Sequence, residues 1–137
     1  MMASQRRGVL LELAVASVED ALAAQQDGAD RLELSAALAQ GGLTPSLGTL
    51  VEVRAAVSLP LVVLVRPRPG GFAYSATDFA VMQRDIDLAL EHGADGLALG
   101  VLATDGRIDA ERCRRLVRQV GGREAVFHRA FDVTPGP

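Results

Sequence analysis

Short apolar runs alternate along the chain with longer amphipathic stretches. The short runs predict strands, and the longer stretches, which open on capping residues, predict helices. The expected strands cover residues 9–13, 32–34, 61–65, 97–99 and 125–128. The expected helices run from Ser17 to about Gly28, from Thr44-Pro45 to about Val57, from Thr77 or Asp78 to about His92, and from Asp109 to about Val120. Such alternation indicates an α/β fold with a parallel sheet.

One segment of this pattern occurs twice. The stretch GADRLEL at residues 28–34 returns as GADGLAL at residues 93–99, an offset of 65 residues that spans two strand-helix units. Equal units of about 32 residues favour a TIM-type (β/α)₈ barrel over a doubly wound sheet. That barrel needs roughly 250 residues, whereas this chain has 137 and about four and a half units.

The sequence therefore predicts a partial barrel over residues 8–137, preceded by a flexible extension at 1–7. We expect truncation to explain the missing units. A half barrel leaves strand edges unpaired at both ends, so a homo-oligomer is a further expectation.

Composition narrows the classes of function. The chain is 49% hydrophobic and 23% charged with a net charge of −3, which is globular and gives no general attraction to nucleic acid or an anionic membrane. No apolar run approaches the roughly 20 residues of a membrane span. A single cysteine, Cys113, excludes an internal disulfide framework. A cytoplasmic protein is expected.

Charged residues collect where the predicted strands end. Barrel enzymes carry their active sites at the carboxyl ends of the strands, and burying polar groups there is costly unless they are paired. The candidate site residues are Glu12, Glu33, Arg66, Arg68, His128, Arg129 and Asp132.

These residues suggest roles in acid-base chemistry on a small anion. Arg66, Arg68 and Arg129 would bind a phosphate or carboxylate, and Glu33 and His128 would exchange protons. Glu12 or Asp132 would orient His128 or bind a hard cation. Structural alternatives stay open at this stage: an ion pair for Glu33, solvated arginines in the RPRPGG loop, and a structural histidine at 128.

Soft-metal ligands are scarce in the pattern. Cys113 lies on an apolar helical stripe with Leu116 and Val120, which predicts a buried core residue. The sequence holds no CxxC, no HxxxH and no methionine-rich run, so the pattern specifies no metal site.

Four ordered motifs resemble the CutC family of copper-homeostasis proteins: LLELAVASVEDALAAQQDGADRLEL, QGGLTPSLG, RPRPGGFAYS and VFHRAFD. The resemblance implies a TIM-type barrel of about twice this length, a cytoplasmic location and a link to copper tolerance. It also places the seven candidate residues on the family's motif positions. Some members carry cysteines after the first and second strands and in the third loop, as candidates for Cu(I). This chain has Ala14 and Val15, Ser35, and Ala73 there.

Two hypotheses of function follow. The resemblance implies a copper-homeostasis protein that binds or traffics copper, whose partner or cofactor would be the metal ion. The charged strand ends favour a barrel enzyme acting on a small anionic metabolite. An inactive fragment is the third possibility.

Overall fold

The computed structural model describes residues 8–135; the predicted extension at 1–7 and the last two residues lie outside that part. Five strands alternate with four helices along the chain, and two short 3₁₀ segments, η1 and η2, join them. The strands are β1 (Glu12–Val15), β2 (Arg31–Leu34), β3 (Leu61–Leu64), β4 (Gly96–Leu99) and β5 (Glu124–Phe127). The helices are α1 (Val18–Gln26), α2 (Leu47–Ala56), α3 (Ala76–Glu91) and α4 (Ala110–Val120), with η1 at Leu38–Gln40 and η2 at Arg129–Val133.

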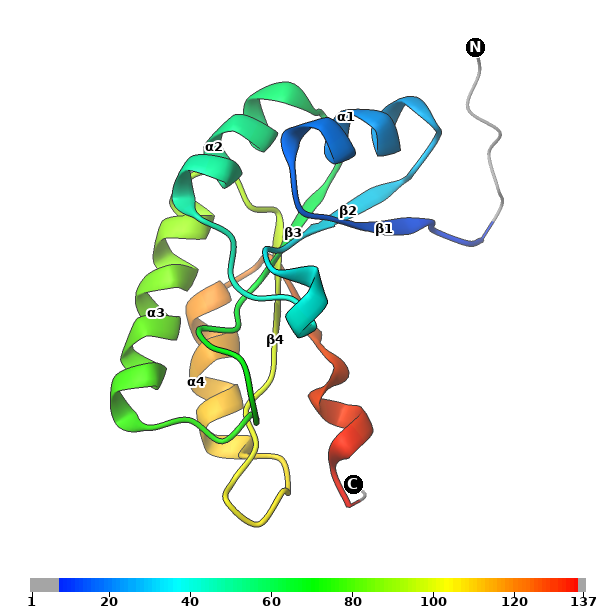
Figure 1. The fold of residues 1–137 in the computed structure, drawn as a ribbon. Coiled ribbons are helices and arrows are strands. Elements are labelled where there is room, and N and C mark those ends of the chain that lie inside the picture. Colours follow the sequence, from blue (N-terminus) through cyan, green and yellow to red (C-terminus); the bar gives the residue numbers. More distant parts are fainter. Residues whose placement is uncertain (1–7, 136–137) are drawn as a thin grey trace.

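The strands form one parallel sheet in the order β1-β2-β3-β4-β5. Each strand therefore pairs with its successor in the chain, as in a (β/α) barrel, and no strand order reverses as it would in a doubly wound sheet. All four helices lie along one side of this sheet, and the opposite side is open (Figure 1). The predicted α/β fold of about four and a half barrel units is confirmed.

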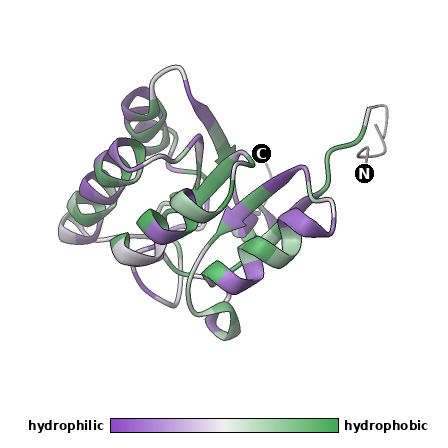
Figure 2. Ribbon diagram, turned by 90° about the horizontal axis from the view of Figure 1, so that it is seen from above, coloured by the Kyte–Doolittle hydropathy of each residue, from purple (hydrophilic) through white to green (hydrophobic). Residues whose placement is uncertain are grey.

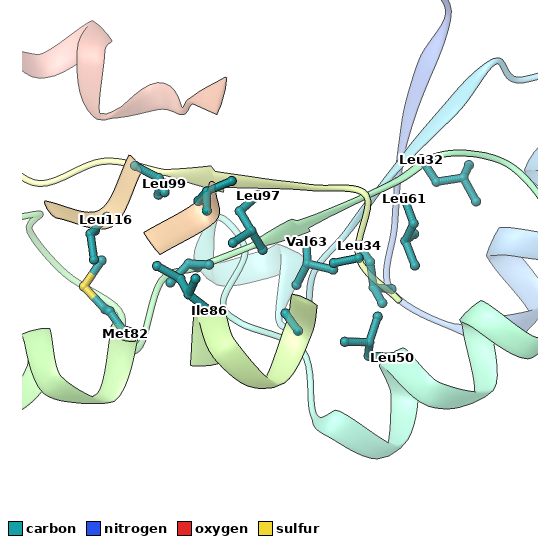
Figure 3. Close-up of a cluster of buried hydrophobic side chains, with 14 of the residues drawn as sticks. Leu32, Leu34, Leu50, Leu61, Val63, Met82, Ile86, Leu97, Leu99 and Leu116 are labelled. Carbon is teal, nitrogen blue, oxygen red and sulfur yellow. The ribbon is translucent and has the colours of Figure 1, made fainter. Parts of the chain in front are cut away.

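The main hydrophobic core lies between the sheet and the helices. Side chains alternate between the two faces of a strand, and every second strand residue, including Leu32, Leu34, Val63 and Leu97, points toward the helices (Figure 3). Met82 and Ile86 of α3 and Leu116 of α4 complete this layer and are inaccessible to solvent. Burial of this kind stabilises by about 25 cal/mol per Å² of apolar surface, so this layer is the main source of the stability of the fold.

The other face of the sheet is the inner wall of the partial barrel. The strand register places Glu33, Val62, Gly96 and Glu124 in one row across four strands, and Leu64, Ala98 and Val126 in the next. Val62, Leu64 and Ala98 form a separate small apolar cluster there. Viewed from above, the strands carry hydrophilic stretches beside hydrophobic ones (Figure 2). The inner wall is thus the more polar of the two faces.

The repeated GAD segments perform the same task twice, as predicted. Gly28 and Gly93 adopt φ of 95° and 105°, which favours glycine after a helix. Asp30 then accepts a hydrogen bond from the Leu11 amide at 2.7 Å, and Asp95 accepts one from the Leu61 amide at 2.9 Å. Each aspartate ties the start of its own strand to the chain entering the strand before it.

Three predicted boundaries are wrong. The first strand begins at Glu12 and does not end at Leu13, because Asp30 fixes Leu11 just before it. Helix α2 is capped by Ser46, not Thr44, whose hydroxyl instead accepts a hydrogen bond from the Arg66 amide at 2.8 Å. Helix α3 is capped by Ser75, one residue before the helix, not by Thr77 or Asp78. The predicted caps Ser17 and Asp109 are confirmed.

None of the helices described for residues 8–135 is long and apolar enough to cross a membrane.

Candidate functional site

A cavity of about 190 Å³ opens at the carboxyl ends of the strands. We call it the mouth pocket. It is lined by Glu33, Gly41, Leu64, Arg66, Phe72, His128 and Arg129. Four of the seven predicted site residues therefore meet in one place: Glu33, Arg66, His128 and Arg129.

Arg66 lies two positions after the last residue of β3 and is only 4% exposed. Its Nη1 donates to the carbonyl oxygens of Gln40 at 2.8 Å and Gly42 at 2.9 Å, and its Nη2 donates to the Gly70 carbonyl at 3.0 Å. A buried guanidinium is tolerated because these oxygens replace water. Arg66 is not a solvated loop residue. It joins the loop after β2 to the loop after β3.

His128 follows β5 and is more than half buried. Its Nδ1 accepts a hydrogen bond from the Ala130 amide at 3.1 Å, and its ring packs against Gly100, where an added Cβ would lie 2.8 Å from Cε1. Burial, reinforced by the charge of Arg66, lowers the pKa of His128 to about 4. The ring is therefore neutral at pH 7. Since Nδ1 is an acceptor, the proton resides on Nε2.

That Nε2 atom is buried and has no hydrogen-bond partner among the described residues. A buried N–H without a partner costs about 1–3 kcal/mol. His128 thus presents an unused donor in a residue that lines the mouth pocket.

Arg129 is the exposed cation of the mouth pocket. Its guanidinium rests on Gly41, where an added Cβ would lie 2.1 Å from Nη2, and it sits 5.9 Å from the ring centroid of Phe72. No described residue accepts a hydrogen bond from its guanidinium, which contrasts with the three carbonyl oxygens on Arg66. Gly41 has φ of 84° and supplies the close approach that the flat side chain requires.

Phe72 connects these side chains and was missed from the sequence. Its buried ring lies 5.2 Å from the Arg66 guanidinium carbon and 5.2 Å from the His128 ring centroid. The only hint in the sequence is its position directly after Gly70-Gly71, which does not distinguish a site aromatic from a core aromatic. Phe72 and Leu64 give the mouth pocket an apolar wall.

Glu33 projects from the inner wall into the mouth pocket. Burial raises its pKa, and the neighbouring carboxylate of Glu12 raises it further. Glu12 itself pairs with Arg31, which also binds Glu124 at 2.7 Å. The predicted position of Glu12 at a carboxyl strand end is wrong, because it is the first residue of β1. Glu12 therefore affects the mouth pocket by raising the pKa of Glu33.

Besides Glu12, two further predicted residues, Arg68 and Asp132, lie outside the lining of the mouth pocket. Arg68 binds Asp78 at 3.0 Å, the Gly71 carbonyl at 2.8 Å and the Ala73 carbonyl at 2.7 Å, so its donors hold its own loop. Asp132 is exposed on η2. The structure does not bring either side chain to the four that meet.

Comparison with known proteins settles the family. The model of the CutC family matches residues 9–137. The chain belongs to the CutC family.

Curated CutC relatives share almost half of their matched residues with this chain. A CutC protein of Treponema denticola is 46% identical over 131 residues, which cover 96% of this chain and 53% of the relative. The human copper homeostasis protein cutC homolog is 46% identical over 98% of this chain and 50% of its own length. The chain spans about half the length of these relatives, in agreement with the partial barrel.

Solved structures agree on the fold. A CutC structure from Streptococcus agalactiae superposes with a TM-score of 0.87 at 35% identity, covering 93% of this chain and 62% of that one. A protein from Burkholderia cenocepacia called a phosphonomutase superposes with a TM-score of 0.56 at 20% identity, covering 81% of this chain and 46% of that one. That second likeness shows the fold alone.

The described CutC residues fit copper poorly. Within residues 8–135, no group of three or more histidine, cysteine, aspartate or glutamate side chains is placed to hold a metal ion. Cys113 packs against the core but is only partly buried, whereas a buried core residue was predicted, and its Sγ donates to the Val101 carbonyl at 3.6 Å. Burial raises the pKa of this thiol, which disfavours the thiolate that Cu(I) prefers.

Proposed function

We propose that this CutC chain acts in cytoplasmic copper homeostasis, and that the mouth pocket is the part that acts. The human and mouse relatives at 46% and 47% identity are named copper homeostasis protein cutC homologs, which supports the first half of the proposal. The chain spans half of these relatives, so it would supply half of the closed barrel.

The observation that carries the second half is the set of unused donors. In the part of the chain that the structure describes, the Arg129 guanidinium has no hydrogen-bond acceptor, and the Nε2 of His128 is buried without a partner. Both line one cavity with Phe72 and Leu64. Ligand sites combine an apolar wall with a few convergent polar groups. We therefore propose that this cavity binds a small anionic ligand, and we assign no copper-binding role to these residues.

A copper-tolerance assay tests this proposal. The chain is expressed in a bacterial host that lacks its own CutC-family protein, and growth is measured as copper rises. We expect the wild-type chain and Cys113→Ser to restore growth equally, since serine keeps a donor for the Val101 carbonyl, and Arg129→Gln to fail. Loss of rescue in Cys113→Ser but not in Arg129→Gln would instead favour direct binding of Cu(I). No rescue by a folded chain would remove the role in copper homeostasis.

The second candidate is an enzyme that acts on a small anion. One observation favours it: burial raises the pKa of Glu33 and lowers that of His128 within one cavity. Opposed shifts of this kind separate a proton-transferring group from a group that stays neutral. In this proposal Glu33 transfers the proton, and neutral His128 donates a hydrogen bond to the reacting oxygen. Deuterium incorporation into small carboxylates in D₂O, present with wild-type chain and absent with Glu33→Gln, is the expected result.

A further inference from the structure

The polar groups of the mouth pocket suit a ligand that carries a single negative charge. We propose that the mouth pocket binds a small monocarboxylate that carries a second oxygen, with the carboxylate on the Arg129 guanidinium and the second oxygen on the Nε2–H of His128. This inference rests on the mouth-pocket part of the proposed function and names the class of ligand.

The balance of charge favours a monoanion. Arg66 has both terminal nitrogens committed to carbonyl oxygens, and its Nε is buried without a partner among the described residues. Arg129 is therefore the cation of the pocket whose terminal nitrogens can face a ligand. Glu33 also lines the cavity, and its carboxylate repels added negative charge whenever it is ionised. Arg66 and Arg129 contribute two positive charges and an ionised Glu33 one negative charge, so the lining carries a net charge of +1. A carboxylate balances this charge, whereas a phosphate dianion exceeds it.

The position of the Arg129 guanidinium suits an oxoanion. It lies against Gly41 and 5.9 Å from the ring centroid of Phe72. The parallel N–H groups of a guanidinium match the two oxygens of a carboxylate. The same fork accepts a phosphate, so the choice of a carboxylate rests on the balance of charge.

The second donor and the apolar wall define the rest of the ligand. His128 offers one N–H from a ring that Gly100 and the Ala130 amide hold in place. Because Nε2 is buried, a carbonyl or hydroxyl oxygen next to the carboxylate would accept this N–H by displacing the atoms that now cover it. Leu64 and Phe72 would contact the carbon skeleton. A cavity of about 190 Å³ has room for a skeleton of a few carbon atoms.

The test is an NMR titration of the ¹⁵N-labelled 137-residue chain with three probes at pH 7. Pyruvate has the carboxylate and the second oxygen, acetate has the carboxylate alone, and inorganic phosphate is the competing oxoanion. We expect pyruvate to bind most tightly and to shift the side-chain N–H signals of Arg129 and His128. Each lost charge-assisted hydrogen bond should weaken binding by about tenfold or more.

Matched variants assign the contacts. Arg129→Gln should weaken pyruvate and acetate alike, by about tenfold or more. His128→Asn keeps an oxygen that can accept from the Ala130 amide but removes the ring donor, so it should weaken pyruvate down to the level of acetate. Arg123→Gln removes an exposed arginine in the turn before β5 and should leave every affinity unchanged. Circular dichroism confirms that each variant is folded.

Three results would overturn the inference: phosphate binding more tightly than pyruvate, pyruvate binding that survives Arg129→Gln, or no binding of any probe by the folded chain. Each is independent of the copper-tolerance assay. Rescue of copper tolerance without carboxylate binding would refute the proposed ligand and leave the role in copper homeostasis standing. Carboxylate binding without rescue would refute the role in copper homeostasis and leave the proposed ligand standing.

Discussion

Two loops at the same end of the sheet use charged residues in opposite ways. The loop after β3 contains Arg66 and Arg68. Their terminal nitrogens donate to backbone carbonyls, Arg68 also binds Asp78, and only the Nε of Arg66 lacks a partner among the described residues. The turn after β5 contains His128 and Arg129, and within residues 8–135 no acceptor pairs with the Nε2 of His128 or with the Arg129 guanidinium. Arginine next to a strand end therefore does not by itself mark a ligand site. What matters is whether the backbone around it already supplies acceptors.

The largest expected effect comes from Arg66, the arginine of this comparison that holds its own loops together. Arg66→Ala leaves three carbonyl oxygens without their donor in a nearly buried place, and we expect a loss of about 4 kcal/mol in the free energy of unfolding. Arg68→Ala is the matched control. Its side chain is 36% exposed, so water can replace more of its contacts and the loss should be clearly smaller. Urea denaturation measures both, and equal losses would contradict the comparison.

The next effect concerns the pH dependence of stability. His128 has its pKa lowered from 6.5 to about 4 by burial, so the folded state disfavours the charged ring. Stability is complete above pH 6.5 and falls as the pH drops toward 4, by up to about 3 kcal/mol. His128→Asn should flatten this slope. Long-range ¹H–¹⁵N spectra should also show the proton on Nε2 at pH 7; a proton on Nδ1 would refute the assigned donor.

A smaller effect separates backbone strain from the position of Arg129. Gly41→Ala and Gly70→Ala both place alanine at positive φ, near 84° and 91°, which costs about 1–2 kcal/mol each. Only the methyl group at 41 would strike the Arg129 guanidinium, whereas the atom nearest to a methyl group at 70 is 3.6 Å away. We expect similar losses of stability by thermal denaturation. Weakened pyruvate binding is expected only in Gly41→Ala.

The smallest expected effect comes from Glu33. Because its folded pKa is raised, stability falls as the pH rises from 4.5, its ordinary value, toward the folded pKa. Glu33→Gln removes this loss and should be slightly more stable than wild type at pH 7 in urea denaturation. The corresponding change at exposed Glu19 of α1 should do little. A destabilised Glu33→Gln would show that the carboxylate makes a favourable ion pair, the structural alternative.

Much of the barrel pattern could be predicted from the sequence because its causes are local. Glycine after a helix, a capping serine or aspartate and an apolar run each act within a few residues. Ser17, Asp109 and the paired GAD segments behaved as predicted for that reason. Thr44 did not, because its hydroxyl is taken by the Arg66 amide, 22 residues away. The residues next to Thr44 in the sequence do not indicate a hydrogen-bond partner at that separation.

The candidate site was predicted only in part, for a related reason. Glu33, Arg66, His128 and Arg129 do meet at the strand ends, as the parallel topology requires. Phe72 was missed because nothing in the run GGFAY distinguishes an aromatic that contacts three polar side chains from one that fills the core. Arg68 was grouped with Arg66 because both flank Pro67, yet their neighbours in space differ.

By itself, the sequence determined the order of strands and helices, the parallel sheet, the incomplete set of barrel units and the end of the sheet where polar residues gather. Periodicity, capping and repeat length carry that information along the chain. Only the tertiary structure decided which polar groups remain free. Satisfaction of a donor depends on acceptors brought close by folding, and burial then determines protonation. Arg66 and Arg129 are the same residue type in two loops at the same end of the sheet. The fold commits the terminal nitrogens of Arg66 to the backbone and leaves those of Arg129 for a ligand.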